Sequence, residues 1–162
     1  MPLFEIRLQA SLEGVALVRP GADHLLRVRF SCGKCRTVSD KLSVFSSTDE
    51  VDVGGGGTPV HALQRCKECS SSGSAVVLPL RPPATGALSA AEAEARKTAV
   101  VYLLECRGLV PVEAQPGPGW SVQGPSGVIW EADLGEDFSE YDEESDTACT
   151  VLDAKLEVQA VR

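Results

Sequence analysis

Two Cys-x-x-Cys pairs constrain this chain more than any other feature of its sequence. Cys32 and Cys35 form the first pair, Cys66 and Cys69 form the second, and 30 residues separate the pairs. Four thiolates complete the tetrahedral coordination of Zn²⁺, with Zn–S bonds of about 2.3 Å. We therefore expect one zinc ion held by these four residues. The site is expected to be structural, because four protein ligands leave no open position for water or substrate.

Two other interpretations of the cysteine pairs stay open at this stage. Disulfides require an oxidising compartment, but residues 1–10 alternate apolar and polar side chains, which favours a strand over a secretion signal. A thioredoxin-like dithiol opens a helix within a βαβ unit, and no such unit is recognisable. We expect a cytoplasmic protein, with access to the nucleus left open.

Alternation of apolar and polar residues dominates the chain and predicts strands. In the first strand Ile6 and Leu8 share a face opposite Glu5 and Arg7. The predicted strands are residues 4–12, 26–30, 41–46, 60–65, 75–80, 98–106, 120–122, 128–134 and 150–161. Turns or loops are expected at 18–21, at the glycine run 54–57 and at 70–74. The fold class predicted is all-β, mostly antiparallel and sandwich- or barrel-like.

One short helix interrupts this pattern. Ser89 and Glu92 have the spacing of a capping box before an alanine-rich stretch that runs to residue 97. The helix divides the chain into an N-terminal zinc-binding half at 1–86, a helical linker at 87–97 and a C-terminal half at 98–162. We expect the three parts to form one compact unit. RVRFSCGKC and VYLLECRGL echo each other faintly, which is consistent with duplication or with chance.

Charge is distributed unevenly along the chain. The net charge is −8, which disfavours binding to nucleic acid. Residues 1–98 carry 12 basic and 10 acidic side chains, whereas residues 99–162 carry 3 and 13. The acids concentrate in 131–146, which is interpreted either as a solvated loop or as a docking surface for a basic protein partner. No apolar run is long enough to span a bilayer, and we expect a monomer.

The remaining reactive side chains are few. Cys106 ends an apolar run and is either a buried thiol or a reactive thiolate favoured by Arg107. The thiolate of Cys149 should be disfavoured by nearby acids. His61 precedes the second cysteine pair and is a weak candidate ligand, since four sulfurs already fill a zinc site. No catalytic constellation is recognisable, so we expect the protein not to be an enzyme.

A further set of motifs extends over the whole chain. Beside the cysteine pairs it includes Lys41, the segment ECRGLVPV at 105–112, GW at 119–120 and the acidic segment at 137–143. Together these resemble the eukaryotic CXXC-motif-containing zinc-binding protein family. The resemblance implies a compact β protein of two pseudo-symmetric halves, with zinc bound in the N-terminal half by the four cysteines. It implies no established enzymatic activity.

Three functional hypotheses follow. The first is a non-enzymatic, zinc-stabilised interaction module. The second is a thiol-dependent reductase similar to methionine sulfoxide reductases, with Cys106 as nucleophile. The third is nucleic-acid binding through basic side chains around the zinc knuckles, which are Arg27, Arg29, Lys34, Arg36, Arg65 and Lys67.

Overall fold

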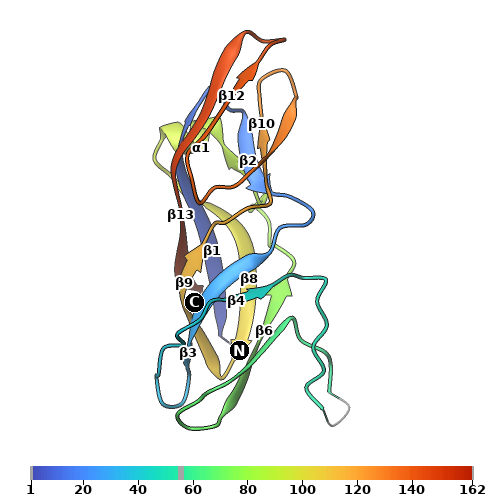
Figure 1. Cartoon of the computed structure of the whole chain (residues 1–162), viewed down its shortest axis with the longest axis vertical. Helices are drawn as coiled ribbons and strands as arrows, with labels where there is room; N and C mark the ends of the chain where they lie inside the picture. Colours follow the sequence, from blue (N-terminus) through green and yellow to red (C-terminus); the bar gives the residue numbers. More distant parts are fainter. Residues whose placement is uncertain (1, 55–56, 162) are drawn as a thin grey trace.

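The computed structural model describes residues 2–54 and 57–161 and has an elongated shape (Figure 1). The elements in chain order are β1 (Leu3–Glu13), β2 (Leu17–Pro20), β3 (Leu26–Cys32), β4 (Ser43–Phe45), β5 (Ala62–Arg65), β6 (Ser72–Leu78), β7 (Leu88–Ser89), α1 (Ala90–Glu94), β8 (Ala99–Arg107), β9 (Leu109–Gln115), β10 (Trp120–Gln123), β11 (Ile129–Ala132), β12 (Phe138–Asp142) and β13 (Thr147–Val161). The predicted all-β class with one short helix is confirmed.

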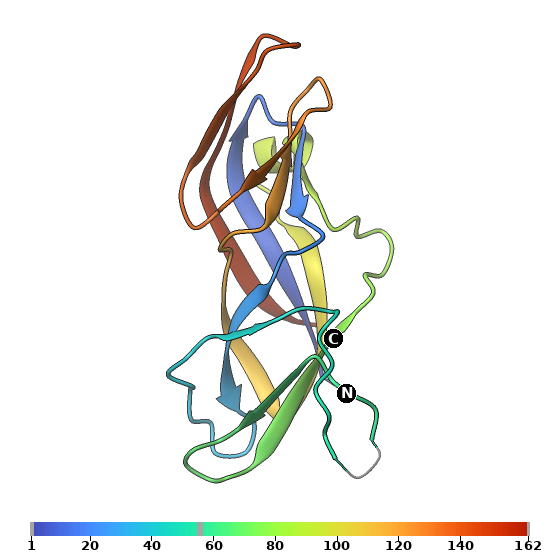
Figure 2. The same cartoon turned by 45° about the vertical axis from the view of Figure 1, so that its right-hand side comes forward.

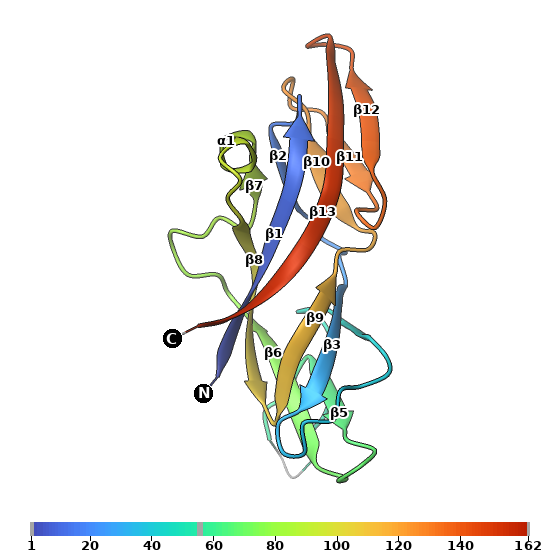
Figure 3. The ribbon, with the colours of Figure 1, turned by 90° about the vertical axis from the view of Figure 1, so that its left-hand side faces the viewer.

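The strands form three curled antiparallel sheets. The largest has the order β12-β13-β1-β8-β6-β5, the second β11-β10-β2-β7 and the third β4-β3-β9. Every sheet contains strands from both before and after the helix, and Figure 3 shows β1 beside β13, with which it pairs. One hydrophobic core runs through all three sheets, with Trp120, Phe30, Ile6 and Leu8 among its largest fully buried side chains.

A β-bulge explains why the burial pattern of the last strand changes phase. Cys149 and Val151 are buried, but after Asp153 the partly buried positions are Ala154 and Leu156. The pairing with β1 slips by one residue at this point, and Asp153 has a φ of 54°. An extra residue in one strand moves the following side chains to the other face. In the strand predicted at 150–161, the face that carries Ala154 and Leu156 therefore lies toward the core only beyond the bulge.

The helix forms where the capping box predicts it, but it is shorter than expected. The Ser89 side chain accepts a hydrogen bond from the Glu92 backbone N–H, and the Glu92 carboxylate accepts one from the Ser89 N–H. The helix ends at Glu94 rather than at residue 97. Arg96 adopts a φ of 57°, a left-handed conformation in which a helix cannot continue.

Several sequence-based boundaries are wrong. Residues 18–21 were expected to turn, but Leu17–Pro20 forms β2 and pairs with β10 and β7. Part of the expected loop at 70–74 belongs to β6. The glycine run at 54–57 includes residues 55–56, which lie outside the described residues, although Val51 and Val60 on either side form an antiparallel bridge.

Besides β2, three strands were not expected: the two-residue β7, β9 and β12. In β9, Pro111 breaks the pattern of a strand, but β9 lies at the edge of its sheet, where a proline removes no ladder hydrogen bond. In the acidic segment, Phe138–Asp142 forms β12 instead of lying entirely in a solvated loop. Asp142 is buried there and accepts hydrogen bonds from the Ser126 N–H and hydroxyl and from the Ser145 N–H.

Candidate metal centre

The two cysteine pairs lie on two turns with the same backbone conformation. In the first turn the Arg36 N–H donates to the Cys32 carbonyl, and in the second the Ser70 N–H donates to the Cys66 carbonyl, at 2.9 and 3.0 Å. Arg36 and Ser70 have left-handed φ values of 66° and 62°. Each turn thus directs both of its sulfurs to one side, which is the arrangement that a zinc site built from two Cys-x-x-Cys turns requires.

The turns belong to different sheets. The first continues β3 of the three-stranded sheet, whereas the second joins β5 to β6 at the edge of the six-stranded sheet. Figure 2 shows both turns at one end of the molecule, far from β12. An ion bound between them would therefore add a direct link between the two sheets at this end of the molecule.

The four sulfurs are close enough to coordinate one ion. All lie within 4.8 Å of one another, and the Cys32–Cys69 and Cys35–Cys66 Sγ–Sγ distances are 3.6 and 3.5 Å. A tetrahedron with Zn–S bonds of 2.3 Å has sulfurs about 3.8 Å apart. The donor set and its spacing therefore fit Zn²⁺. Cys32 is buried, Cys66 and Cys69 are partly buried and Cys35 is exposed.

Hydroxyl residues two positions after each pair support the ligands. The Thr37 hydroxyl lies 3.2 Å from the Cys35 sulfur, and its hydrogen bond lowers the pKa of that thiol. Ser71 acts in the same way on the second turn and lowers the pKa of Cys69 to about 6. Thiolates are the form that binds zinc. The shared pattern Cys-x-x-Cys-x-Thr/Ser was visible in the sequence but was not used to predict these residues.

A third segment also supports the site. Gly108, at the turn between β8 and β9, accepts a hydrogen bond from the Gly33 N–H at 2.9 Å. A Cβ atom on Gly73 would lie 2.8 Å from the Gly108 carbonyl carbon, and one on Gly33 would lie 3.1 Å from it. The backbone of Gly108 thus packs against both cysteine turns. Sequence reasoning noted this glycine only as part of the ECRGLVPV motif.

The other candidate residues lie away from the four sulfurs. The Nδ1 atom of His61 accepts a hydrogen bond from the Val77 N–H at 2.7 Å, so it is engaged with β6. Cys106 has 1% of its surface exposed, and burial raises the pKa of its thiol to about 12. Cys149 is fully buried, and burial raises its pKa as well. Within 2–54 and 57–161 the four cysteines are the only candidate metal cluster.

The histidine that sequence analysis left without a role is also buried. The Nε2–H of His24 donates to the Pro116 carbonyl at 3.1 Å, so its Nδ1 accepts from the Tyr102 hydroxyl at 2.6 Å. Burial lowers the pKa of His24, although the bond to Pro116 opposes this shift and the charge of Arg27 adds to it. The ring connects three segments of the chain, and burial favours its neutral form. In the described ranges, no helix is long and apolar enough to cross a membrane.

The fold and the cysteine cluster together define a zinc-binding β protein in which four cysteines from two turns are spaced to coordinate one ion. Comparison with known proteins agrees with this class. Residues 5–159 match the model of the family described as CXXC motif containing zinc binding protein, eukaryotic. The chain belongs to this family, as its motifs predicted.

Relatives share most of their length with this chain. A CXXC motif containing zinc binding protein from Xenopus laevis is 36% identical over 90% of each chain. One from Homo sapiens is 32% identical and covers 86% of this chain and 87% of its own. The crystal structure of C1orf123 superposes with a TM-score of 0.86 at 27% identity and covers 98% of this chain and 99% of its own. A hypothetical protein from Plasmodium falciparum has a TM-score of 0.85 at 15% identity, over 98% and 100% of the two chains, and shows the shared fold.

Proposed function

We propose that the zinc ion is structural and that the protein is a non-enzymatic interaction module. The observation that carries this proposal is the closed set of four thiolates on two different sheets. Bound zinc would fix the end of the three-stranded sheet to the edge of the six-stranded sheet. It would offer no free coordination position to a substrate.

The surroundings of the remaining cysteines support a non-enzymatic role. A nucleophilic cysteine needs a thiolate that a substrate can reach. Cys106 is buried with a pKa raised to about 12, and Cys149 is also buried with a raised pKa. Both properties favour the interaction module over the reductase hypothesis. Phe30, two residues before Cys32 on β3, is completely buried, so it is not available to stack on nucleic-acid bases.

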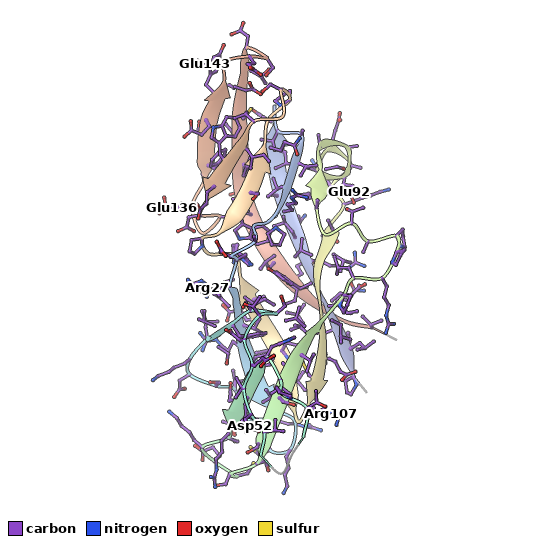
Figure 4. All side chains as sticks on the ribbon, turned by 90° about the vertical axis from the view of Figure 1, so that its right-hand side faces the viewer. Arg27, Asp52, Glu92, Arg107, Glu136 and Glu143 are labelled. Atoms are coloured by element: carbon purple, nitrogen blue, oxygen red, sulfur yellow. The ribbon has the colours of Figure 1, made fainter. Side chains whose placement is uncertain are left out.

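The proposed docking surface is the acidic hairpin, which we define as residues 131–146. This segment contains nine acidic residues and no basic residue. All of its acidic side chains except Asp142 are exposed, and Figure 4 shows Glu143 at the end of the molecule opposite Asp52 and Arg107. Buried Asp142 fixes the hairpin to the β10–β11 turn through Ser126. The charges are therefore held on an ordered scaffold.

The proposed partner is a protein with a basic surface. We propose that this chain binds it in the cytoplasm and as a monomer. Opposite charges accelerate association and select a partner by the sign of its surface. A reducing compartment keeps the four zinc ligands as thiolates.

A charge-reversal experiment tests this proposal. The triple variant Glu140→Lys, Glu143→Lys and Glu144→Lys changes exposed side chains of the hairpin. A matched control reverses Asp40, Asp49 and Glu50, which are also exposed but lie in the first third of the chain. Binding of a fluorescent octalysine peptide at low salt is measured by anisotropy. We expect at least about a tenfold loss of affinity in the hairpin variant alone.

Equal binding by the hairpin variant and the wild type would remove the acidic hairpin as the docking surface. An equal loss of affinity in both variants would mean that the peptide responds to net charge alone, which would also contradict the proposal. Zinc content is measured for each variant, because a variant that has lost its metal reports on folding rather than on docking.

A further inference from the structure

A cavity of about 420 Å³ lies on the flank of the molecule, between the β9–β10 loop and the turn after β11. Figure 4 shows Arg27 on this flank, between the acidic hairpin and the end that carries Arg107. The lining includes Arg27, Pro116, Gly117, Pro118, Leu134 and Ala154. Arg27 is the only charged residue in the lining, and no carboxylate faces it there.

Arg27 is a cation without a partner in the described part of the chain. Its Nε atom is buried and makes no hydrogen bond. Arg29, two residues further along the same strand, differs in this respect. Its Nε donates to the Glu113 carboxylate at 3.1 Å and its Nη1 to the Ser39 carbonyl at 2.8 Å. Among the described residues the Nη groups of Arg27 make no hydrogen bond or ion pair either. Because unpaired guanidinium donors are costly, these groups have capacity to bind an anion from outside the chain.

The cavity is built before any ligand enters. Gly117 has a φ of 59°, and a Cβ atom there would lie 2.5 Å from the Arg27 Nε, so only a glycine fits over the arginine side chain. The Gly117 carbonyl accepts a hydrogen bond from the Leu134 N–H at 2.9 Å. The Pro116 carbonyl accepts hydrogen bonds from Trp120 and His24. These contacts hold the loop in place, which reduces the entropic cost of binding.

We propose that this cavity binds a small molecule with an oxyanion head group on a compact apolar body. The guanidinium fork of Arg27 matches the geometry of a carboxylate or a phosphate. Pro116, Pro118, Leu134 and Ala154 provide apolar surface for the rest of the molecule. The volume of about 420 Å³ leaves room for a compact ligand such as a single-ring acid together with water. The proposal is independent of the zinc centre and of the acidic hairpin.

Isothermal titration of the zinc-loaded protein with three probes tests this inference. Benzoate and phenyl phosphate carry the two head groups on the same ring, and benzamide is the neutral analogue of benzoate. We expect benzoate or phenyl phosphate to bind at least about tenfold more tightly than benzamide. Arg27→Gln should remove this preference. Arg29→Gln, which changes the net charge equally on the same strand, should retain it.

Amide chemical shifts locate the ligand and separate the two head groups. Perturbation of Gly117 and Gly135, which both line the cavity, is expected with the probe that binds. The tighter of the two anions identifies the head group that the site prefers. The inference is overturned if benzamide binds as well as both anions, or if Arg27→Gln binds them like the wild type. A loss of equal size in Arg29→Gln would also overturn it, since the effect would then come from net charge.

Discussion

Replacement of Phe30 by alanine tests how the hydrophobic core positions the first zinc ligand. Phe30 is fully buried, lies two residues before Cys32 on β3 and packs against Phe45 with ring centroids 6.1 Å apart. A buried phenylalanine removes roughly 150–250 Å² from water, worth about 4–6 kcal/mol at ~25 cal/mol per Å². Alanine retains part of this area, so we expect Phe30→Ala to cost about 3–5 kcal/mol.

The assay is thermal unfolding of the zinc-loaded protein. For a chain of 162 residues, each kcal/mol lowers Tm by about 2–4 °C, so Tm should fall by roughly 6–20 °C. Val112→Ala on the neighbouring strand β9 is the matched control, because Val112 is 45% exposed and should cost well under about 1 kcal/mol. The zinc affinity of Phe30→Ala should also fall, since the strand that carries Cys32 is less firmly packed.

A loss of stability below about 1 kcal/mol in Phe30→Ala, or a loss equal to that of Val112→Ala, would refute this reasoning. Either result would mean that Phe30 contributes no more than an exposed side chain and that the metal alone orders the end of β3.

Three further predictions concern single side chains. Burial lowers the pKa of His24 in the folded state. The stability that its neutral form contributes is therefore complete above the unfolded pKa of about 6.5 and falls as the pH drops below that value. Denaturant unfolding at pH 5–7.5 should show this loss of stability, and His24→Phe should show a smaller loss. Because Cys106 is buried and its pKa is raised, it should resist alkylation by iodoacetamide in the folded, zinc-loaded protein and react after unfolding. Rapid labelling of Cys106 in the folded chain would restore the reductase hypothesis. Gly73→Ala places a Cβ 2.6 Å from the Leu109 Cγ and 2.8 Å from the Gly108 backbone. The free energy of unfolding should therefore fall by about 1–3 kcal/mol, and zinc binding should weaken. An unchanged Tm and zinc affinity would show that the turn between β8 and β9 does not support the site.

The sequence predicted the zinc ligands because their chemistry is local. Cys32 and Cys35 form one turn and Cys66 and Cys69 another, so the spacing alone indicated two knuckles. The sequence could not show that the two cysteine turns lie on different sheets, because sheet order depends on pairing between strands far apart in the chain. The supporting role of Gly108 depends on the same pairing, since β9 brings it between the two turns.

Strand prediction succeeded where alternation was regular and failed where another residue property hid it. In β1 the alternation of Ile6 and Leu8 with charged residues gave the strand correctly. No strand was predicted for β9, where Pro111 interrupts the alternation, and in β12 the many carboxylates favoured a solvated segment. The buried position of Asp142 is satisfied by hydrogen bonds from residues 126 and 145, and a single sequence offers no signal for such contacts.

Native mass spectrometry of the purified, reduced chain tests most directly whether zinc joins the two sheets. We expect one zinc ion per chain, and we expect hydrogen exchange to accelerate at both cysteine turns and along β5 once a chelator removes the metal. A chain that carries no zinc, or whose cysteine turns exchange at the same rate with and without it, would contradict the central claim.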